Sequence, residues 1–383
     1  MFTHGHEDHI SGLPYVYSTL GKPKIFASRL TAAFLESKFK EMKIKHNINY
    51  ENGKAQVSYE KEYQFGGINI RFVRVTHSIP DTNHIIIKTP AGVIYHGSDY
   101  KFDLTPPYGP TADFFEIARA GRDGVLCLLS DCLGSEEEGL TLSESIVGQT
   151  FEDEMRRTKG KFIMTTFSSN ISRIRQCVEA AVKFNRKTFF LGRSMKENTE
   201  IAKKIGYLPI PYSLVGEEKE ISRLPTNKVC IIAAGSQGQK DSALSKLALK
   251  QNPHAKIATG DKVIFSSDPI PGNEDEVYDL IEKLIVQGAD VVYSDIHEEL
   301  HASGHGNRED LKLLIRLTNP KYFIPIGGMI RHQRQYQIIG ENLGYRKESV
   351  IMLNEGETVL IENNILKRGE KVKTKDIFIK SNE

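Results

Sequence analysis

The sequence predicts an α/β protein made of two parts that differ in the rhythm of their secondary structure. Residues 1–131 hold short apolar or alternating runs joined by loops, as in a strand-rich layer. After Gly139, strand-like runs and amphipathic helical segments alternate, which is typical of a parallel sheet flanked by helices. The length of 383 residues exceeds one ordinary hydrophobic core and therefore also favours two domains.

The first part contains three clear strand signals. Residues 68–72 alternate apolar and polar side chains, as a half-buried strand does. Apolar runs at residues 85–87 and 93–95 flank the turn-forming residues 89–92 and predict a hairpin. Residues 125–129 are wholly apolar, which suits a central strand that is buried on both faces.

The second part alternates strands with helices whose starts can be recognised. A strand at residues 162–164 leads through Ser168-Ser169-Asn170, a good capping sequence, into a helix over residues 171–184. After a strand at residues 188–191, Ser194 is expected to cap a helix that runs to residue 205. The remaining predicted elements are strands at 229–233 and 263–265, a helix at 275–287, a strand after 289, a helix at 309–317 and a strand at 322–326.

The composition predicts a globular protein of the cytoplasm. Hydrophobic residues make up 39% and charged residues 26%, an ordinary balance for a chain with a sizeable core. Because the formal net charge is only +2, any basic groove for a polyanion has to be local. The four cysteines form no CxxC pair and are expected as buried thiols in a reducing compartment. No apolar run reaches the roughly 20 residues of a membrane span, and histidines and acids stand where a secretion leader would be.

The strongest local signal is the run His4-Gly5-His6-Glu7-Asp8-His9. Residues two apart on an extended backbone face the same way, so His4 and His6 can hold one metal ion. Asp8 and His9 fall at the start of the next helix and point toward a second ion. Imidazole and carboxylate ligands suit zinc, with manganese as the alternative where oxygen ligands dominate. The competing interpretation is a polar surface loop with coincidental histidines.

Two further candidate ligands follow predicted strands. His77 comes after the strand that begins at residue 68, and Asp99 comes after the strand at residues 93–95. Taken alone, each would be an ordinary capping or surface residue. Their shared position at strand ends, downstream of the histidine run, favours metal ligands, with Asp99 as the bridge between two ions.

Five more segments occur in an order that resembles a known family. They are Leu129-Ser130-Asp131, Gly192-Arg193-Ser194-Met195, Gly235-Ser236-Gln237-Gly238, Pro269-Ile270-Pro271-Gly272-Asn273-Glu274 and His301-Ala302-Ser303-Gly304-His305. Together with the histidine run, they make nearly the whole chain similar to the ribonuclease J family of metallo-β-lactamase-fold nucleases. The two long segments are specific, whereas the segments at 192–195 and 235–238 are informative only together.

The resemblance implies a fold and its division into domains. Residues 1–147 and 297–366 would form a metallo-β-lactamase-like αββα sandwich. Residues 148–296 would form an inserted β-CASP domain, a parallel sheet with flanking helices, and residues 367–383 would be a tail or the start of a C-terminal extension.

The resemblance also implies a metal-dependent phosphodiesterase in which two metal ions activate water. His4, His6, His77 and Asp99 would bind one zinc ion, and Asp8, His9 and Asp99 would bind a second, with Mn²⁺ or Mg²⁺ as alternatives. Catalytic roles fall on Asp8, Asp131 and His305, where His305 would assist the leaving group while a carboxylate holds its ring. The alternative for His305 is a structural histidine that fixes its turn.

The implied substrate is single-stranded RNA with a 5′-monophosphate, clamped over the metal ions by the insertion. Main-chain N–H groups at glycine-rich turns and helix starts suit phosphate oxygens. A phosphate pocket beside the ions favours stepwise 5′-to-3′ degradation, with internal cleavage as a second mode, in RNA maturation and decay. The resemblance also points to a homodimer or homotetramer and to no membrane partner. The residues assigned to RNA or its 5′-phosphate, each of which is otherwise ordinary loop chemistry, are Phe167, Ser168, Arg193, Gly235, Ser236, His301 and Ser303.

The chain departs from the family pattern in three places. Gly327-Gly328-Met329 stands where the pattern has His-Gly-Glu, which removes a ligand of the second ion and makes its occupancy doubtful; His332 is the nearest replacement. Only three residues precede the histidine run, so the sandwich is expected to be incomplete at its N-terminus. The chain also stops soon after Leu366, which suggests truncation at both ends.

Two rival functions stay open. The first is a catalytically impaired relative that still binds RNA, which the missing ligand at Gly327 and the short N-terminus motivate. The second is another hydrolase on the same scaffold that acts on a thioester or a lactam. The inserted domain argues against the second rival, because a small substrate does not need a clamp.

Overall fold

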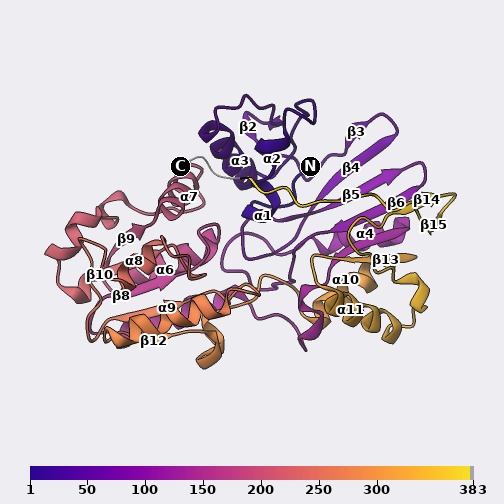
Figure 1. The fold of residues 1–383 in the computed structure, drawn as a ribbon. Coiled ribbons are helices and arrows are strands. Elements are labelled where there is room, and N and C mark those ends of the chain that lie inside the picture. Colours follow the sequence, from indigo (N-terminus) through magenta and orange to yellow (C-terminus); the bar gives the residue numbers. More distant parts are fainter. Residues whose placement is uncertain (380–383) are drawn as a thin grey trace.

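The computed structural model describes residues 1–379 and places two main sheets in separate halves of the molecule (Figure 1). Within those residues one sheet has six strands and the other has five, and helices pack against both. This architecture confirms the predicted α/β class, with a parallel sheet in the second part of the chain. The predicted tail is residues 367–383, and its last four residues, 380–383, lie outside the described residues.

The six-stranded sheet has the order β13-β7-β6-β5-β4-β3 and is mixed. Strands β3 to β6 pair antiparallel, whereas β7 runs parallel to both β6 and β13. The apolar run predicted as a central strand is therefore β7, which has a neighbour on each side. The strands are β3 (Tyr63–Phe65), β4 (Ile68–Arg74), β5 (Asn83–Thr89), β6 (Gly92–Gly97), β7 (Cys127–Asp131) and β13 (Tyr322–Ile326).

Three helices cover one face of this sheet: α4 (Phe114–Asp123), α10 (Arg308–Thr318) and α11 (Ile330–Asn342). Their apolar residues, such as Ile117, Leu314 and Tyr336, share one core with Tyr95 and Leu128 of the strands. The hairpin of β14 (Val359–Glu362) and β15 (Ile365–Arg368) adds a smaller cluster around β7 and β13.

The five-stranded sheet is parallel and has the order β12-β11-β8-β10-β9. Its two faces are apolar because helices cover both of them, as the continuous apolar strands predict. The strands are β8 (Phe162–Thr165), β9 (Lys187–Leu191), β10 (Val229–Ala233), β11 (Lys262–Phe265) and β12 (Asp290–Val292).

Helices α8 (Ala243–Ala248) and α9 (Glu274–Val286) contribute to the core on one face of the parallel sheet. Helices α5 (Glu144–Arg157), α6 (Ile171–Lys183) and α7 (Arg193–Lys204) contribute to the core on the other. Ser194 was predicted as the N-cap of α7, but the helix begins at Arg193, so that prediction was wrong. Gly192 is its N-cap with φ 103°, a conformation that glycine tolerates and that leaves Ser194 inside the first turn.

The N-terminal segment connects the two halves. It contains α1 (Glu7–Ile10), α2 (Leu13–Val16), α3 (Arg29–Glu41) and the short hairpin of β1 (Tyr50–Glu51) and β2 (Lys54–Ala55). Leu30, Phe34 and Leu35 of α3 belong to the same core as α5 and α6. Single 3₁₀ turns link the other elements: η1 (Leu133–Glu136), η2 (Tyr212–Leu214), η3 (Glu218–Arg223), η4 (Thr226–Lys228), η5 (Ser294–Ile296), η6 (Glu298–Leu300) and η7 (Lys347–Ser349).

The strand directions bring several candidate site residues to one edge of the six-stranded sheet. Because β4 and β6 are both antiparallel to β5, they run the same way, and β7 and β13 follow that direction. His77, Asp99, Asp131 and Gly327 therefore all lie at or just beyond the carboxyl end of a strand. None of the helices within residues 1–379 has the length and apolarity needed to cross a lipid bilayer.

Candidate metal centre

Four side chains from three distant segments meet at this edge. His4 and His6 precede α1, His77 lies in the loop after β4, and Asp99 lies in the loop after β6. One ligand atom from each of these residues lies within 4.8 Å of the others. The structure thus brings together the set that the sequence assigned to the first ion.

The unpaired atoms of this group test whether a metal ion fits. The side chain of His4 is fully buried, and its Nε2 has no hydrogen-bond partner and lies 3.7 Å from Oδ2 of Asp99. His77 donates its Nδ1–H to the carbonyl oxygen of Gly304 at 2.6 Å, which leaves the Nε2 lone pair 3.1 Å from Nδ1 of His6. A buried nitrogen without a partner and two facing ring nitrogens fit a cation between them.

Protonation states agree with this fit. Burial lowers the pKa of His4 and of His77 well below the ordinary value, and it lowers the pKa of His6 to about 4. Burial alone would raise the pKa of Asp99, but its hydrogen bond with His9 and the nearby histidine charges hold that pKa well below its usual range. Neutral imidazoles beside an ionised carboxylate are the forms that bind a divalent metal ion.

The residues predicted for a second ion are arranged differently. Nε2 of His9 lies 3.3 Å from Oδ2 of Asp99 and 3.5 Å from Oδ2 of Asp8, whose side chain is 77% exposed. Among the described residues, the groups whose ligand atoms all lie within 4.8 Å include neither Asp8 nor His9. His9 instead acts as an ion-pair partner: burial alone would lower its pKa, but the carboxylates of Asp99 and Asp8 raise it.

Asp131 and His305 form a close pair beside Asp99, and these three make the other group of mutually close ligand atoms. Nδ1–H of His305 donates to Oδ2 of Asp131 at 2.6 Å, and the amide of Leu133 donates to the other carboxylate oxygen at 2.9 Å. Burial alone would lower the pKa of His305, but the charge and hydrogen bond of Asp131 raise it to about 9. The pair is therefore oriented and charge-compensated by its own members.

Gly327 stands where the family pattern has a histidine, so this position offers no side-chain ligand. Gly327 has φ 78°, and a Cβ added there would lie 3.3 Å from Oδ1 of Asp131. His332 does not replace the ligand, because its Nδ1 accepts the amide of Met329 at 3.1 Å and its Nε2 lies 3.4 Å from Glu136. His332 belongs to neither group of ligand atoms.

Comparison with known proteins decides the family. Residues 159–284 match the family model "Ribonuclease J, beta-CASP domain". The chain is 35% identical over 382 residues to "Ribonuclease J 1" of Streptococcus pyogenes serotype M3, and the match covers 100% of this chain and 67% of that protein. The chain belongs to the ribonuclease J family. "Ribonuclease J" of Thermus thermophilus is 38% identical, with 93% of this chain and 62% of that protein covered.

The match to other ribonuclease J proteins is partial in length. "Ribonuclease J" of Helicobacter pylori (strain B128) is 34% identical over 379 residues, which are 99% of this chain and 54% of that protein. The chain thus spans about half the length of such relatives. A crystal structure of a protein of unknown function from Enterococcus faecalis V583 has a TM-score of 0.61 at 13% identity, covering 96% of this chain and 80% of that one, and shares the fold alone.

Several residues that the sequence analysis assigned to RNA binding lie at one edge of the parallel sheet. Thr165, Leu191 and Ala233 end three neighbouring strands in register, so the loops that follow them are adjacent. Phe167 and Ser168 are half-buried in the first of these loops, and Arg193 is exposed at the start of α7. Gly235, with φ 118°, and the buried Ser236 follow β10.

The two other candidates lie in the loop before α10. Oγ of Ser303 accepts the amide of His305 at 3.1 Å. The ring of His301 lies between Arg173, whose Nη1 is 2.8 Å from Nδ1, and Asp268, whose Oδ2 is 3.3 Å from Nε2. Both nitrogens of His301 therefore already have protein partners. Arg173 was missed by the sequence reasoning, since a single arginine in an amphipathic helix carries no local signal of burial.

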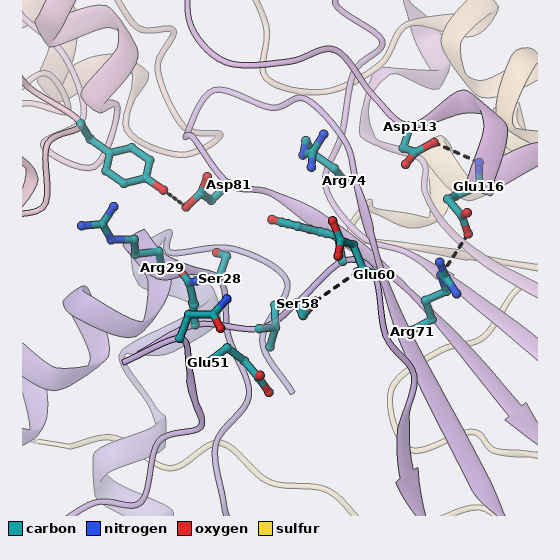
Figure 2. Close-up of a pocket in the computed structure, with 15 residues that line it drawn as sticks. Ser28, Arg29, Glu51, Ser58, Glu60, Arg71, Arg74, Asp81, Asp113 and Glu116 are labelled. Atoms are coloured by element: carbon teal, nitrogen blue, oxygen red, sulfur yellow. Dashed lines mark hydrogen bonds and ion pairs between the residues drawn. The ribbon is translucent and has the colours of Figure 1, made fainter. Parts of the chain in front are cut away.

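A cavity of about 520 Å³ lies away from the histidine group, and Figure 2 shows Arg29 and Asp81 on one side of it and the Arg71–Glu116 ion pair on the other. A neighbouring cavity of about 270 Å³ shares Arg29, Arg74 and Asp81 with it and reaches His77. Of these two cavities, the smaller one is lined by a residue of the histidine group, His77, and the larger one is not.

Proposed function

We propose that this protein is a metal-dependent ribonuclease that hydrolyses phosphodiester bonds of single-stranded RNA. One observation carries the proposal: the buried, unpaired Nε2 of His4 and the facing ring nitrogens of His6 and His77 lie beside an oriented Asp131–His305 pair. The membership in the ribonuclease J family supports the same chemistry. Because the chain covers only part of its relatives, the activity has to be measured on this chain itself.

We assign the metal ligands from the geometry and the residue types. His4, His6, His77 and Asp99, whose ligand atoms are mutually close, would hold one ion. By residue type, Asp8 and His9 with Asp99 would hold a second ion, more weakly because their ligand atoms form no such close group. Three imidazoles favour Zn²⁺, with Mn²⁺ or Mg²⁺ as alternatives at the more oxygen-rich second position. A divalent ion at such a site supplies activation of water at neutral pH and neutralises charge on phosphate oxygens.

The remaining side chains would position RNA and move protons. Asp131 holds Nδ1–H of His305, so Nε2 of this ring is the atom that would give a proton to the leaving oxygen. Asp8 would assist beside the second ion. The loops at Phe167, Arg193 and Ser236 would face the RNA strand, since they share one edge of the parallel sheet.

We further propose that residues 148–296, which hold the five-stranded sheet and its helices apart from the first turn of α5, form the inserted domain that closes over RNA against residues 1–147 and 297–366. Main-chain N–H groups around Gly235 and Ser236, and the hydroxyl of Ser303, would hold a 5′-monophosphate. His301 would act in that pocket through its position, because both of its nitrogens are engaged. Such an arrangement favours removal of nucleotides from the 5′ end, with internal cleavage as a second mode.

The test uses the purified chain loaded with Zn²⁺ or Mn²⁺ and single-stranded RNA that carries a 5′-monophosphate, a 5′-triphosphate or a 5′-hydroxyl. We expect mononucleotides to be released first from the monophosphate substrate, and a chelator to stop the reaction. Binding without cleavage under every metal condition would identify an RNA-binding relic. Turnover of a thioester or a lactam without cleavage of RNA would identify another hydrolase.

A further inference from the structure

Arg173, on the first turn of α6, is a fully buried arginine whose donors reach three separate segments of the chain. Its Nη2 donates to the carbonyl oxygen of Ala302 at 2.9 Å, and its Nη1 donates to that of Ser266 at 2.8 Å. Nη1 also lies 2.8 Å from Nδ1 of His301. One guanidinium group therefore fixes both the end of β11 and the start of the loop at residues 301–306.

The direction of the hydrogen bond to His301 follows from chemistry. A guanidinium group has donors and no acceptor, so Nδ1 of His301 has to be the acceptor. Burial, assisted by the charge of Arg173, lowers the pKa of His301 to about 4, which is consistent with a neutral ring. Its proton is then on Nε2, which lies 3.3 Å from the Asp268 carboxylate. Arg173 thus sets both the orientation and the tautomer of His301.

The loop held by Arg173 carries two contacts to the metal centre. The carbonyl oxygen of Gly304 accepts Nδ1–H of His77 at 2.6 Å, and His305 contacts Asp131 at 2.6 Å. The amide of Gly306 donates to the carbonyl oxygen of Tyr100 at 2.6 Å, one residue after Asp99. A carbonyl that binds the second nitrogen of a ligand histidine fixes which nitrogen faces the metal.

The charge of Arg173 is compensated by a buried carboxylate. Glu144, at the start of α5, accepts from Nη2 with both carboxylate oxygens, at 2.7 and 2.8 Å. Lys101, which is fully buried two residues after Asp99, lies 3.2 Å from the same carboxylate. Moving the guanidinium group away from Glu144 would leave a buried charge without a partner, which is costly, so Arg173 is expected to keep its position.

We propose that Arg173 is a positioning residue of the active site, which holds the loop at residues 301–306 so that Gly304 orients His77 and His305 meets Asp131. This inference rests on the proposed function for its effect on cleavage, but its effect on the metal site can be observed without turnover. The side-chain hydrogen bonds of Arg173 reach Glu144, Ser266, His301 and Ala302, and none of these four is a proposed metal ligand.

The test compares Arg173→Lys with Arg186→Lys in the full chain. Lysine keeps the positive charge beside Glu144 but lacks the planar fork that spans Ala302, Ser266 and His301. Arg186 is a matched control, since it is 5% exposed and donates to the carbonyls of Thr158 and Gly160 at 2.7 Å, away from the loop. For Arg173→Lys we expect kcat on 5′-monophosphate RNA to fall about 10- to 100-fold, with a much smaller change in KM.

The independent measurement is the visible absorption spectrum of each variant loaded with Co²⁺, which reports on the ligand geometry of the metal. We expect the spectrum of Arg173→Lys to change and that of Arg186→Lys to match the parent chain. A purely structural role would lower the melting temperature of both variants and leave the spectrum of the folded protein unchanged. An unchanged spectrum with unchanged kcat would overturn the proposal. If the parent chain cleaves no RNA, the proposed function fails and the spectra still decide the role of Arg173.

A milder variant covers the case in which Arg173→Lys does not fold. Ser266→Ala removes the hydrogen bond from Oγ of Ser266 to the carbonyl oxygen of Leu300, at 2.7 Å, and leaves the backbone acceptor of Arg173 in place. We expect the same change in the Co²⁺ spectrum at smaller amplitude, with kcat reduced by a few fold. A parent-like spectrum and kcat in this variant would contradict the proposal that contacts at Ser266 help to hold the loop at residues 301–306.

Discussion

The two neighbouring groups that share Asp99 differ in how their polar atoms are satisfied. In the group of His4, His6 and His77, Nε2 of His4 lacks a hydrogen-bond partner, and Nε2 of His77 faces Nδ1 of His6 at 3.1 Å. In the group of Asp131 and His305, the imidazole and the carboxylate satisfy each other directly. Buried polar atoms without partners are rare in proteins, so the unpaired Nε2 of His4 favours a cation in the first group, whereas Nδ1 of His305 in the second is already paired with Asp131. We therefore propose metal binding for the first group and proton transfer for the second.

The largest effect should come from removing a ligand of the histidine group. His77→Ala removes a ligand whose orientation is fixed by Gly304, and we expect kcat/KM on RNA to fall by about three orders of magnitude or more, since a metal ion supplies several kcal/mol of charge stabilisation. Bound metal, measured by elemental analysis, should fall with it while circular dichroism stays parent-like. His46→Ala, at an exposed histidine, is the control. Parent-like cleavage by His77→Ala would remove the metal mechanism.

The paired group should respond in another way. His305→Ala removes the ring that Asp131 holds, and we expect kcat to fall about 10²- to 10⁴-fold, the usual contribution of a general acid or base. Metal content should stay at the level of the parent chain, because the first group keeps its four ligands. If His305→Ala loses its metal instead, the assignment of the two groups to different roles is wrong.

A stability measurement tests the buried charges that surround Arg173 next to these two groups. Burial alone would raise the pKa of Glu144, but Arg173 and Lys101 lower it to about 2. An acid with a depressed folded-state pKa stabilises the fold above its unfolded value near 4.5, and this contribution is lost as the pH falls toward 2. We expect Glu144→Gln to cost about 3 kcal/mol of unfolding free energy at pH 7. The difference from the parent chain should shrink between pH 4.5 and 2 in denaturant titrations; a constant difference would contradict it.

The smallest effect concerns the glycine beside the paired group. Gly327→Ala and Gly344→Ala both place a side chain at positive φ, 78° and 89°, and each should cost about 1 kcal/mol of stability. Only the Cβ at position 327 meets Asp131, at 3.3 Å, whereas nothing lies within 4 Å of a Cβ at position 344. We therefore expect Gly327→Ala alone to reduce RNA cleavage as well, by a few fold. Equal activity of the two variants would show that Asp131 tolerates the contact.

Local patterns predicted much of the fold and the first ligand group. The strands at β4, β7 and β13 follow from alternation and apolar runs, and the order of strand ends places His77 and Asp99 on one edge. The pairing of His4 with His6 can be predicted without distant residues, because residues two apart on an extended backbone face the same side. Ser194 was predicted as a cap because its residue type suits one, but the positive φ of Gly192 moved the start of the helix.

Long-range pairing is what the sequence could not provide. His9 and Asp8 have ligand chemistry, yet the structure pairs His9 with both Asp8 and Asp99. Among the described residues, neither His9 nor Asp8 belongs to a group of mutually close ligands. The contacts of Arg173 with Glu144 and Ala302 join residues that are 29 and 129 positions apart, and no local pattern marks them. His332 looked like a replacement ligand by proximity in sequence, but Met329 and Glu136 hold its ring.

A zinc titration of the metal-free chain, followed by native mass spectrometry, tests whether the histidine group binds a metal ion. We expect one ion to bind first and tightly to the parent chain, and His4→Ala, which removes the unpaired buried nitrogen, to lose this ion while remaining folded. Equal zinc binding by the parent chain and His4→Ala would contradict this expectation.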